Sequence, residues 1–62
     1  MKWEAIRGGW ALYSDAQWMG TIFVEGNYVT GIYRSGRAYQ PYPSVEHAKA
    51  AIEAALALEG YS

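Results

Sequence analysis

Short runs of β-branched and aromatic residues alternate with glycines along the first two thirds of the chain. Two of these runs, residues 2–7 and 10–14, flank Gly8–Gly9, and small turn residues between such runs are typical of a hairpin. The polar residues 15–17 then lead into a further run at 18–25. The pattern predicts an antiparallel hairpin that continues into a third strand.

Two more turn signals extend this arrangement. Gly26–Asn27 is followed by the run 28–34, and Ser35–Gly36 is followed by a short run at 37–40. Pro41 comes next, and we expect it to end the last strand, because proline cannot donate a hydrogen bond to a sheet. The pattern therefore predicts an antiparallel meander of four or five strands.

The hydrophobic period changes from that of a strand to that of a helix near residue 44. Ser44 is a typical helix cap, segment 45–59 is rich in alanine, and Gly60 is a typical helix stop. Apolar residues recur at helical spacing at Val45, Ala48, Ile52, Ala55 and Leu56. We predict a helix over 45–59 that buries Ile52 and Leu56 against the sheet.

One helix can cover only one face of this sheet, although both faces are apolar. If Gly26–Asn27 is a two-residue turn, Val24 pairs with Val29, and Ile22 pairs with Gly31 on the same face. The opposite face then carries Phe23, Tyr28 and Ile32. Because large exposed apolar patches are unusual on soluble monomers, we expect a cover for this face. A partner protein, a second copy, or the tryptophans together with a folded-over loop would each provide one.

Length and composition narrow the classes of function. The 62 residues suit one small α+β domain, with strands over about 2–40 and one C-terminal helix over about 45–59. The chain has no cysteine and a single histidine, so we expect no catalytic activity, no metal and no cofactor. The net charge of −1 disfavours nucleic acid as a partner. No apolar run approaches the roughly 20 residues of a membrane span, and we expect a cytoplasmic protein.

The segment 33–43 concentrates tyrosine, arginine and proline. With Ser35–Gly36 at the turn, Arg34 and Arg37 become cross-strand neighbours, with tyrosines behind them. Such a hairpin tip fits a protein hot spot or phosphate groups, or it only keeps the hairpin soluble. The candidate partner-binding residues are Phe23, Tyr28, Ile32, Tyr33, Arg34, Arg37 and Tyr39.

Residues 18–59 combine a strand containing Trp18 with a helix start that reads Tyr42, Ser44, Glu46 and Ala48. This combination resembles the three-strands-plus-helix layout of the DNA-binding domains of plant ethylene-response factors and of phage integrases. The resemblance implies that Trp18, Arg34 and Arg37 contact DNA from the face of the sheet.

The chain also resembles, in kind, the small accessory proteins of phages and mobile elements, including anti-CRISPR proteins. These are single small domains that are poor in cysteine and have no catalytic residues. The resemblance implies an inhibitor that binds and blocks a host defence complex in the bacterial cytoplasm. A DNA-binding domain that uses the sheet face with the Arg34 and Arg37 hairpin, and a homodimeric structural module, are the alternatives.

Overall fold

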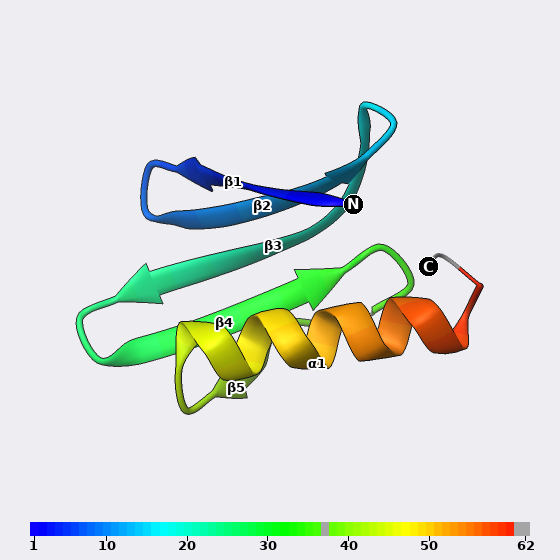
Figure 1. The fold of residues 1–62 in the computed structure, drawn as a ribbon. Helices are drawn as coiled ribbons and strands as arrows, with labels where there is room; N and C mark the ends of the chain where they lie inside the picture. The colour runs from blue at the N-terminus through cyan, green and yellow to red at the C-terminus, as the bar shows by residue number, and fades with distance from the viewer. Residues whose placement is uncertain (37, 61–62) are drawn as a thin grey trace.

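The computed structural model describes residues 1–36 and 38–60 and has five strands followed by one helix (Figure 1). The elements are β1 (Lys2–Ile6), β2 (Gly9–Ser14), β3 (Gln17–Glu25), β4 (Tyr28–Tyr33), β5 (Gln40–Tyr42) and α1 (Val45–Leu58). The strands form one antiparallel sheet in the order β1-β2-β3-β4-β5, and the helix packs on one of its faces. The predicted α+β meander is confirmed.

The first hairpin turns one residue earlier than predicted. Arg7 and Gly8 form the turn, with Gly8 at a φ of 85°, and Gly9 pairs with Ile6 as the first residue of β2. Gly9 also lies opposite Phe23 of β3, where any side chain would overlap the backbone of the neighbouring Ile22. Gly9 is therefore needed for the close approach of two strands rather than for the turn.

The turns on either side of β3 use left-handed backbone conformations. Asp15 and Ala16 have φ angles of 51° and 67°, so the turn predicted at 15–17 contains two residues, and Gln17 already belongs to β3. Gly26 has a φ of 60°, as expected for the first residue of a tight hairpin turn. The predicted pairing of Val24 with Val29 is confirmed.

The last strand lies later in the chain than predicted. It was expected at 37–40 with Pro41 as its end, whereas β5 spans Gln40–Tyr42 and contains Pro41. Proline is tolerated there because β5 is an edge strand, whose outer side needs no hydrogen-bond donor. Gly31 pairs with Gln40, which is the register that a Ser35–Gly36 turn predicts, although Ala38 and Tyr39 lie outside the strand.

The helix follows the sequence signals closely. The backbone N–H of His47 donates a hydrogen bond to the side chain of Ser44, which caps the first turn. At the other end, Glu59 is the cap residue and Gly60 has a φ of 90°, so the helix ends one residue before its predicted boundary. Ile52 and Leu56 are fully buried, which confirms the predicted apolar stripe.

The core lies between α1 and one face of the sheet. It consists of Leu12, Met19, Ile22, Val29, Ala48, Ile52 and Leu56. Ile52 sits over two glycines of the sheet, because a methyl group built at Gly20 or Gly31 would come within 3.2 or 3.1 Å of its side chain. The two glycines thus let the helix approach the sheet closely.

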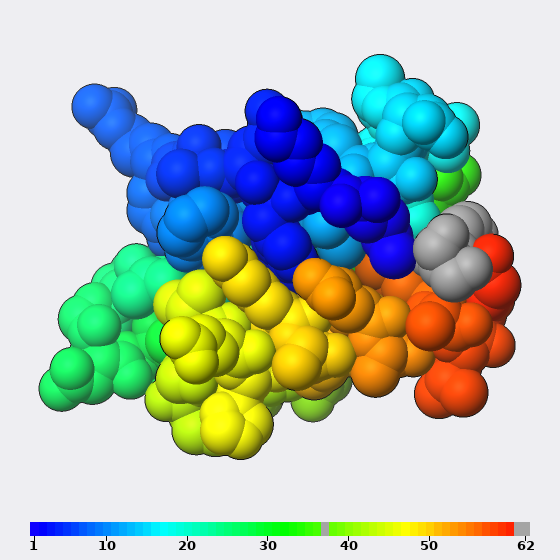
Figure 2. Space-filling view, viewed as in Figure 1, coloured from blue at the N-terminus to red at the C-terminus, as the bar shows by residue number. Residues whose placement is uncertain are grey.

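Two tryptophans attach the β1–β2 hairpin to this layer. The indole N–H of Trp3 donates a hydrogen bond of 2.6 Å to Glu53, and Lys49 Nζ lies 3.7 Å from the centre of the Trp10 ring. The helix backbone runs beside β3, β4 and β5, so these side chains bridge the remaining distance. Figure 2 accordingly shows the N-terminal strands in contact with the helix.

Candidate interaction surface

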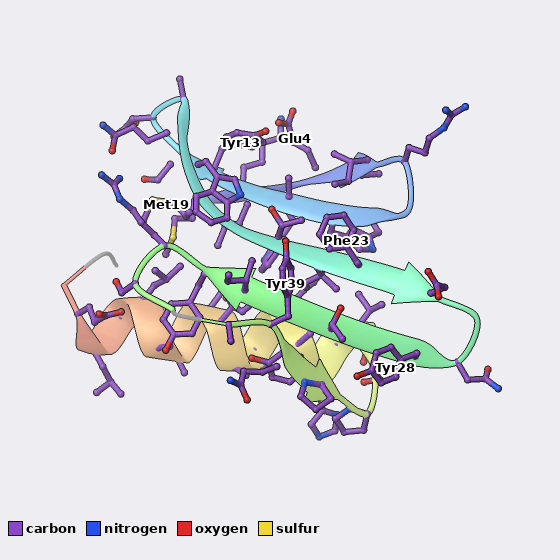
Figure 3. The ribbon with its side chains drawn as sticks, turned by 180° about the vertical axis from the view of Figure 1, so that it is seen from behind. Glu4, Tyr13, Met19, Phe23, Tyr28 and Tyr39 are labelled. Atoms are coloured by element: carbon purple, nitrogen blue, oxygen red, sulfur yellow. The ribbon has the colours of Figure 1, made fainter. Side chains whose placement is uncertain are left out.

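The sheet face opposite α1, here called the open face, is not covered by any second layer of the described structure. The strand pairs Phe23–Thr30 and Thr21–Ile32 lie on this face, since their neighbours in the sequence point into the core. The side chains on this face belong to Lys2, Glu4, Ile6, Ala11, Tyr13, Trp18, Thr21, Phe23, Glu25, Tyr28, Thr30, Ile32, Tyr39 and Pro41. Figure 3 views it directly, with the helix behind the sheet.

Four aromatic side chains dominate the open face. The exposed fractions are 40% for Trp18, 40% for Phe23, 61% for Tyr28 and 52% for Tyr39. Since an aromatic side chain carries about 150–250 Å² of surface, the four together expose roughly 400 Å². An apolar patch of this size is often functional on a monomeric protein.

Tyr39 reaches the open face from the segment between β4 and β5. Its ring crosses β4 and approaches Phe23 of β3, with 5.7 Å between ring centres and an interplanar angle of 53° (Figure 3). This tilted geometry is favourable for two aromatic rings. A loop residue therefore covers part of the open face, as one of the alternatives above anticipated, whereas Trp3 and Trp10, which that alternative also required, lie on the helix side. Both the Phe23 and the Tyr39 ring stay partly exposed.

Trp18 joins the open face because β3 contains a bulge. Leu12 pairs with Gly20 whereas Tyr13 pairs with Trp18, so Met19 is an extra residue in β3. The extra residue reverses the alternation of side chains, and Met19 enters the core while the Trp18 ring lies on the open face. The indole N–H of Trp18 then donates a hydrogen bond of 2.6 Å to Thr21 Oγ1, which holds the ring against the sheet.

Arg34, one of the two basic residues of the predicted hairpin tip, lies at one end of the sheet. Arg34 Nη1 donates a hydrogen bond of 3.1 Å to Gln17 Oε1, and the Arg34 backbone N–H donates to the carbonyl of Met19. Arg34 is thereby placed beside the start of β3. Arg37 lies outside the described residues, so the predicted neighbourhood of the two arginines stays a prediction.

The structure brings together four of the seven predicted site residues, namely Phe23, Tyr28, Ile32 and Tyr39. Tyr33 does not join them. It pairs with Gly20 and packs against the core on the helix side. Tyr13 and Trp18 are further members that the list of candidate partner-binding residues did not include, although the resemblance to DNA-binding domains had placed Trp18 on the face of the sheet. Tyr13 follows from simple alternation along β2, whereas Trp18 depends on the bulge.

The side chains of the open face can interact with a partner by surface contacts. Residues 1–36 and 38–60 contain no detected pocket and no group of three acidic, histidine or cysteine side chains that could hold a metal ion. The single histidine, His47, lies in the first turn of the helix, where its Nδ1 is 3.2 Å from Ser44 Oγ. The available interactions are aromatic contacts, hydroxyl hydrogen bonds and a few charges.

No helix in the described ranges combines the length and apolar character that crossing a bilayer requires.

Comparisons of the chain with protein-family models, with curated proteins and with solved structures gave no match. The resemblances to DNA-binding domains and to phage accessory proteins therefore stay predictions.

Proposed function

We propose that this protein is a non-catalytic binding module that holds another protein against its open face. The observation that carries the proposal is the set of four partly exposed aromatic rings on one face of the sheet. Tyrosine and tryptophan are enriched among the residues that dominate protein interfaces, because they bury much area at little cost in side-chain entropy. The Tyr39 and Trp18 rings are held in place by contacts within the domain, which lowers that cost further.

The proposed partner is a protein complex of a bacterial host, which the module binds stoichiometrically and blocks. This choice rests on the resemblance in kind to phage accessory proteins such as anti-CRISPR proteins. A standard interface takes about 800 Å² from each partner. The aromatic rings would supply about half of that area and the polar residues around them the rest.

Nucleic acid is the second candidate, because aromatic rings on a sheet also stack on unpaired bases. Lys2 is the described basic residue on this face, with Arg34 beside the start of β3, and Glu4 and Glu25 would oppose a phosphate backbone. Protein is preferred as the partner for this reason.

The test uses the immobilised protein to capture its partner from a bacterial lysate, followed by affinity measurements with the purified partner. Tyr28→Ala should weaken binding at least thirtyfold, which corresponds to about 2 kcal/mol for an interface anchor. Leu58→Ala is the matched control, because Leu58 is a 90% exposed apolar residue on the helix, away from the open face. Thermal melts should show both variants folded.

Equal capture by wild type and Tyr28→Ala would contradict the proposal. Titration with single-stranded and duplex DNA at low and moderate salt distinguishes a nucleic-acid partner from a protein partner. Submicromolar DNA binding that falls steeply with salt, and that is lost when Arg34 and Arg37 are both replaced by alanine, would favour nucleic acid instead.

A further inference from the structure

The two edges of the sheet differ in their capacity to accept another strand. The β5 edge has three residues, and the middle one is Pro41. The β1 edge has five residues, Lys2–Ile6, and contains neither a proline nor a bulge. Edge strands with unpaired backbone groups are templates for strand addition, and proline blunts them. The β1 edge is therefore the one that is open to pairing.

The backbone groups that β1 directs outward can be identified from the hydrogen bonds of β2. The Val24 N–H donates to the carbonyl of Gly8, so Gly8 faces β3 and the alternating residue Gly9 faces β1. The β1 residues bonded to β2 are then Ile6, Glu4 and Lys2. Trp3 and Ala5 lie between them, and their N–H and C=O groups point away from the sheet.

The charged side chains of β1 add a specific pattern to this edge. Lys2 and Glu4 are both exposed and lie two residues apart on the open face. Neither side chain has a hydrogen bond or an ion pair within residues 1–36 and 38–60. Such charges discourage pairing with an arbitrary strand, but they are complementary to the same sequence running in the opposite direction.

We propose that a second copy of this chain pairs antiparallel along β1, with Trp3 opposite its own counterpart across a two-fold axis. This register uses the outward backbone groups of Trp3 and places Lys2 opposite the partner's Glu4 twice, once on each side of the axis. These are non-hydrogen-bonded positions, where opposing side chains lie closest. Shifting the register by one step brings Glu4 opposite Glu4, which like-charge repulsion disfavours.

On the helix side, β1 carries Trp3 and Ala5, and Glu53 and Lys49 of α1 lie beside the Trp3 ring. Trp3 is half-buried there, and its hydrogen bond to Glu53 fixes the direction of the indole ring. Lys49 Nζ lies 5.7 Å from the centre of that ring. Each Trp3 ring therefore leans from the edge toward α1, and the seam is held by the backbone hydrogen bonds and the two Lys2–Glu4 pairs.

The dimer has a consequence for the open face. A two-fold axis perpendicular to the sheet joins the two sheets edge to edge and leaves both open faces on the same side. Each dimer would then present two binding surfaces to a target, and simultaneous engagement would raise avidity beyond the affinity of one face. The pairing itself does not depend on the proposed function, and its test requires no partner protein.

The experiment measures mass by sedimentation equilibrium from micromolar to millimolar concentration. The wild type should approach twice the monomer mass of 6.9 kDa as the concentration rises. Lys2→Glu or Glu4→Lys alone turns both cross-strand pairs repulsive and should weaken the dimer about tenfold, since each exposed pair contributes modestly. Mixing the two variants should restore association, because each copy then carries the charges that complement the other.

A matched control and a second readout accompany these variants. Gln40→Glu adds a charge to the opposite edge and should leave association unchanged. In the wild type, hydrogen exchange of the Trp3 and Ala5 amides should slow as the concentration rises. A monomer at millimolar concentration, a mixture that does not recover, or unchanged exchange at these amides would each overturn the proposal. A monomer that still captures another protein through Tyr28 would leave the proposed function intact.

Discussion

Replacing Ile52 by alanine is expected to remove a large share of the stability of this domain. The side chain is fully buried, and its Cγ2 and Cδ1 atoms lie over Gly20 and Gly31. The substitution removes the equivalent of three buried methylene groups at about 0.8 kcal/mol each, or about 2.4 kcal/mol of transfer free energy. The cavity that remains adds to this loss.

The cavity should collapse only in part, because Gly20 and Gly31 beneath Ile52 have no side chains of their own to fill the space. We therefore expect a total loss of about 3–5 kcal/mol. A chain of 62 residues has a free energy of unfolding of about 3–9 kcal/mol. The variant should thus be largely unfolded or close to its midpoint at room temperature.

Urea denaturation followed by tryptophan fluorescence is a suitable assay. Trp3 and Trp10 contact the helix through Glu53 and Lys49, so their emission reports directly on helix docking. Leu58→Ala is the control, because this exposed side chain should change the free energy of unfolding by less than about 0.5 kcal/mol. A loss below about 1 kcal/mol for Ile52→Ala, with an unchanged denaturant slope, would refute the packing argument.

A double-mutant cycle tests the contact between Ile52 and the sheet more closely. Gly31→Ala places a methyl group 3.1 Å from Ile52 Cδ1, so the substitution should destabilise the wild type. Ile52→Val removes Cδ1, and Gly31→Ala should then cost less. The expected coupling between the two changes in the free energy of unfolding is at least about 0.5 kcal/mol. If the two changes are simply additive, residue 31 and Ile52 Cδ1 are not in contact.

Three further predictions concern the turns and the titration of a tyrosine. Ala16→Gly should raise the free energy of unfolding by about 1 kcal/mol, because Ala16 has a φ of 67°, which glycine adopts without strain; a lower melting temperature would contradict this. Gly9→Ala should abolish cooperative unfolding, since the added Cβ would overlap the backbone of Ile22, and a normal melt would show that β2 and β3 are not so close. Burial, with a smaller contribution from Tyr33, raises the pKa of Tyr42 above its ordinary value of 10.0. The unfolded chain therefore loses this proton first, so the associated stability should be complete below about pH 10 and decline as the pH rises further; Tyr42→Phe should reduce that decline in urea melts.

Local sequence signals predicted the elements and several of their contacts. Helix 45–58 follows from alanine content, the Ser44 cap and Gly60, which act within one or two turns of the chain. The pairing across Gly26–Asn27 follows from a two-residue turn, because turn length sets the register of a hairpin. Ile52 and Leu56 were recognisable as core residues, since helical spacing places them on one stripe.

The predictions were wrong at two kinds of position. One is where two strands approach closely, and the other is in an edge strand, where proline is tolerated. Gly9 resembled a turn residue in the sequence, but its function is to let β2 lie against Ile22 of β3. Pro41 resembled the end of a strand, but an edge strand has one side without partners, and proline fits there. Neither distinction is encoded in the residues adjacent to these positions.

The sequence by itself determined an antiparallel meander, one helix and a doubly apolar sheet, because these depend on residue types and periodicity over short distances. Only the tertiary structure decided which aromatic rings share the open face. The extra residue Met19 reverses the alternation of β3 and turns Trp18 outward. Tyr39 reaches Phe23 only because the segment after β4 folds across the sheet. Both depend on contacts between strands, and strand-to-strand contacts cannot be read from a single run of residues.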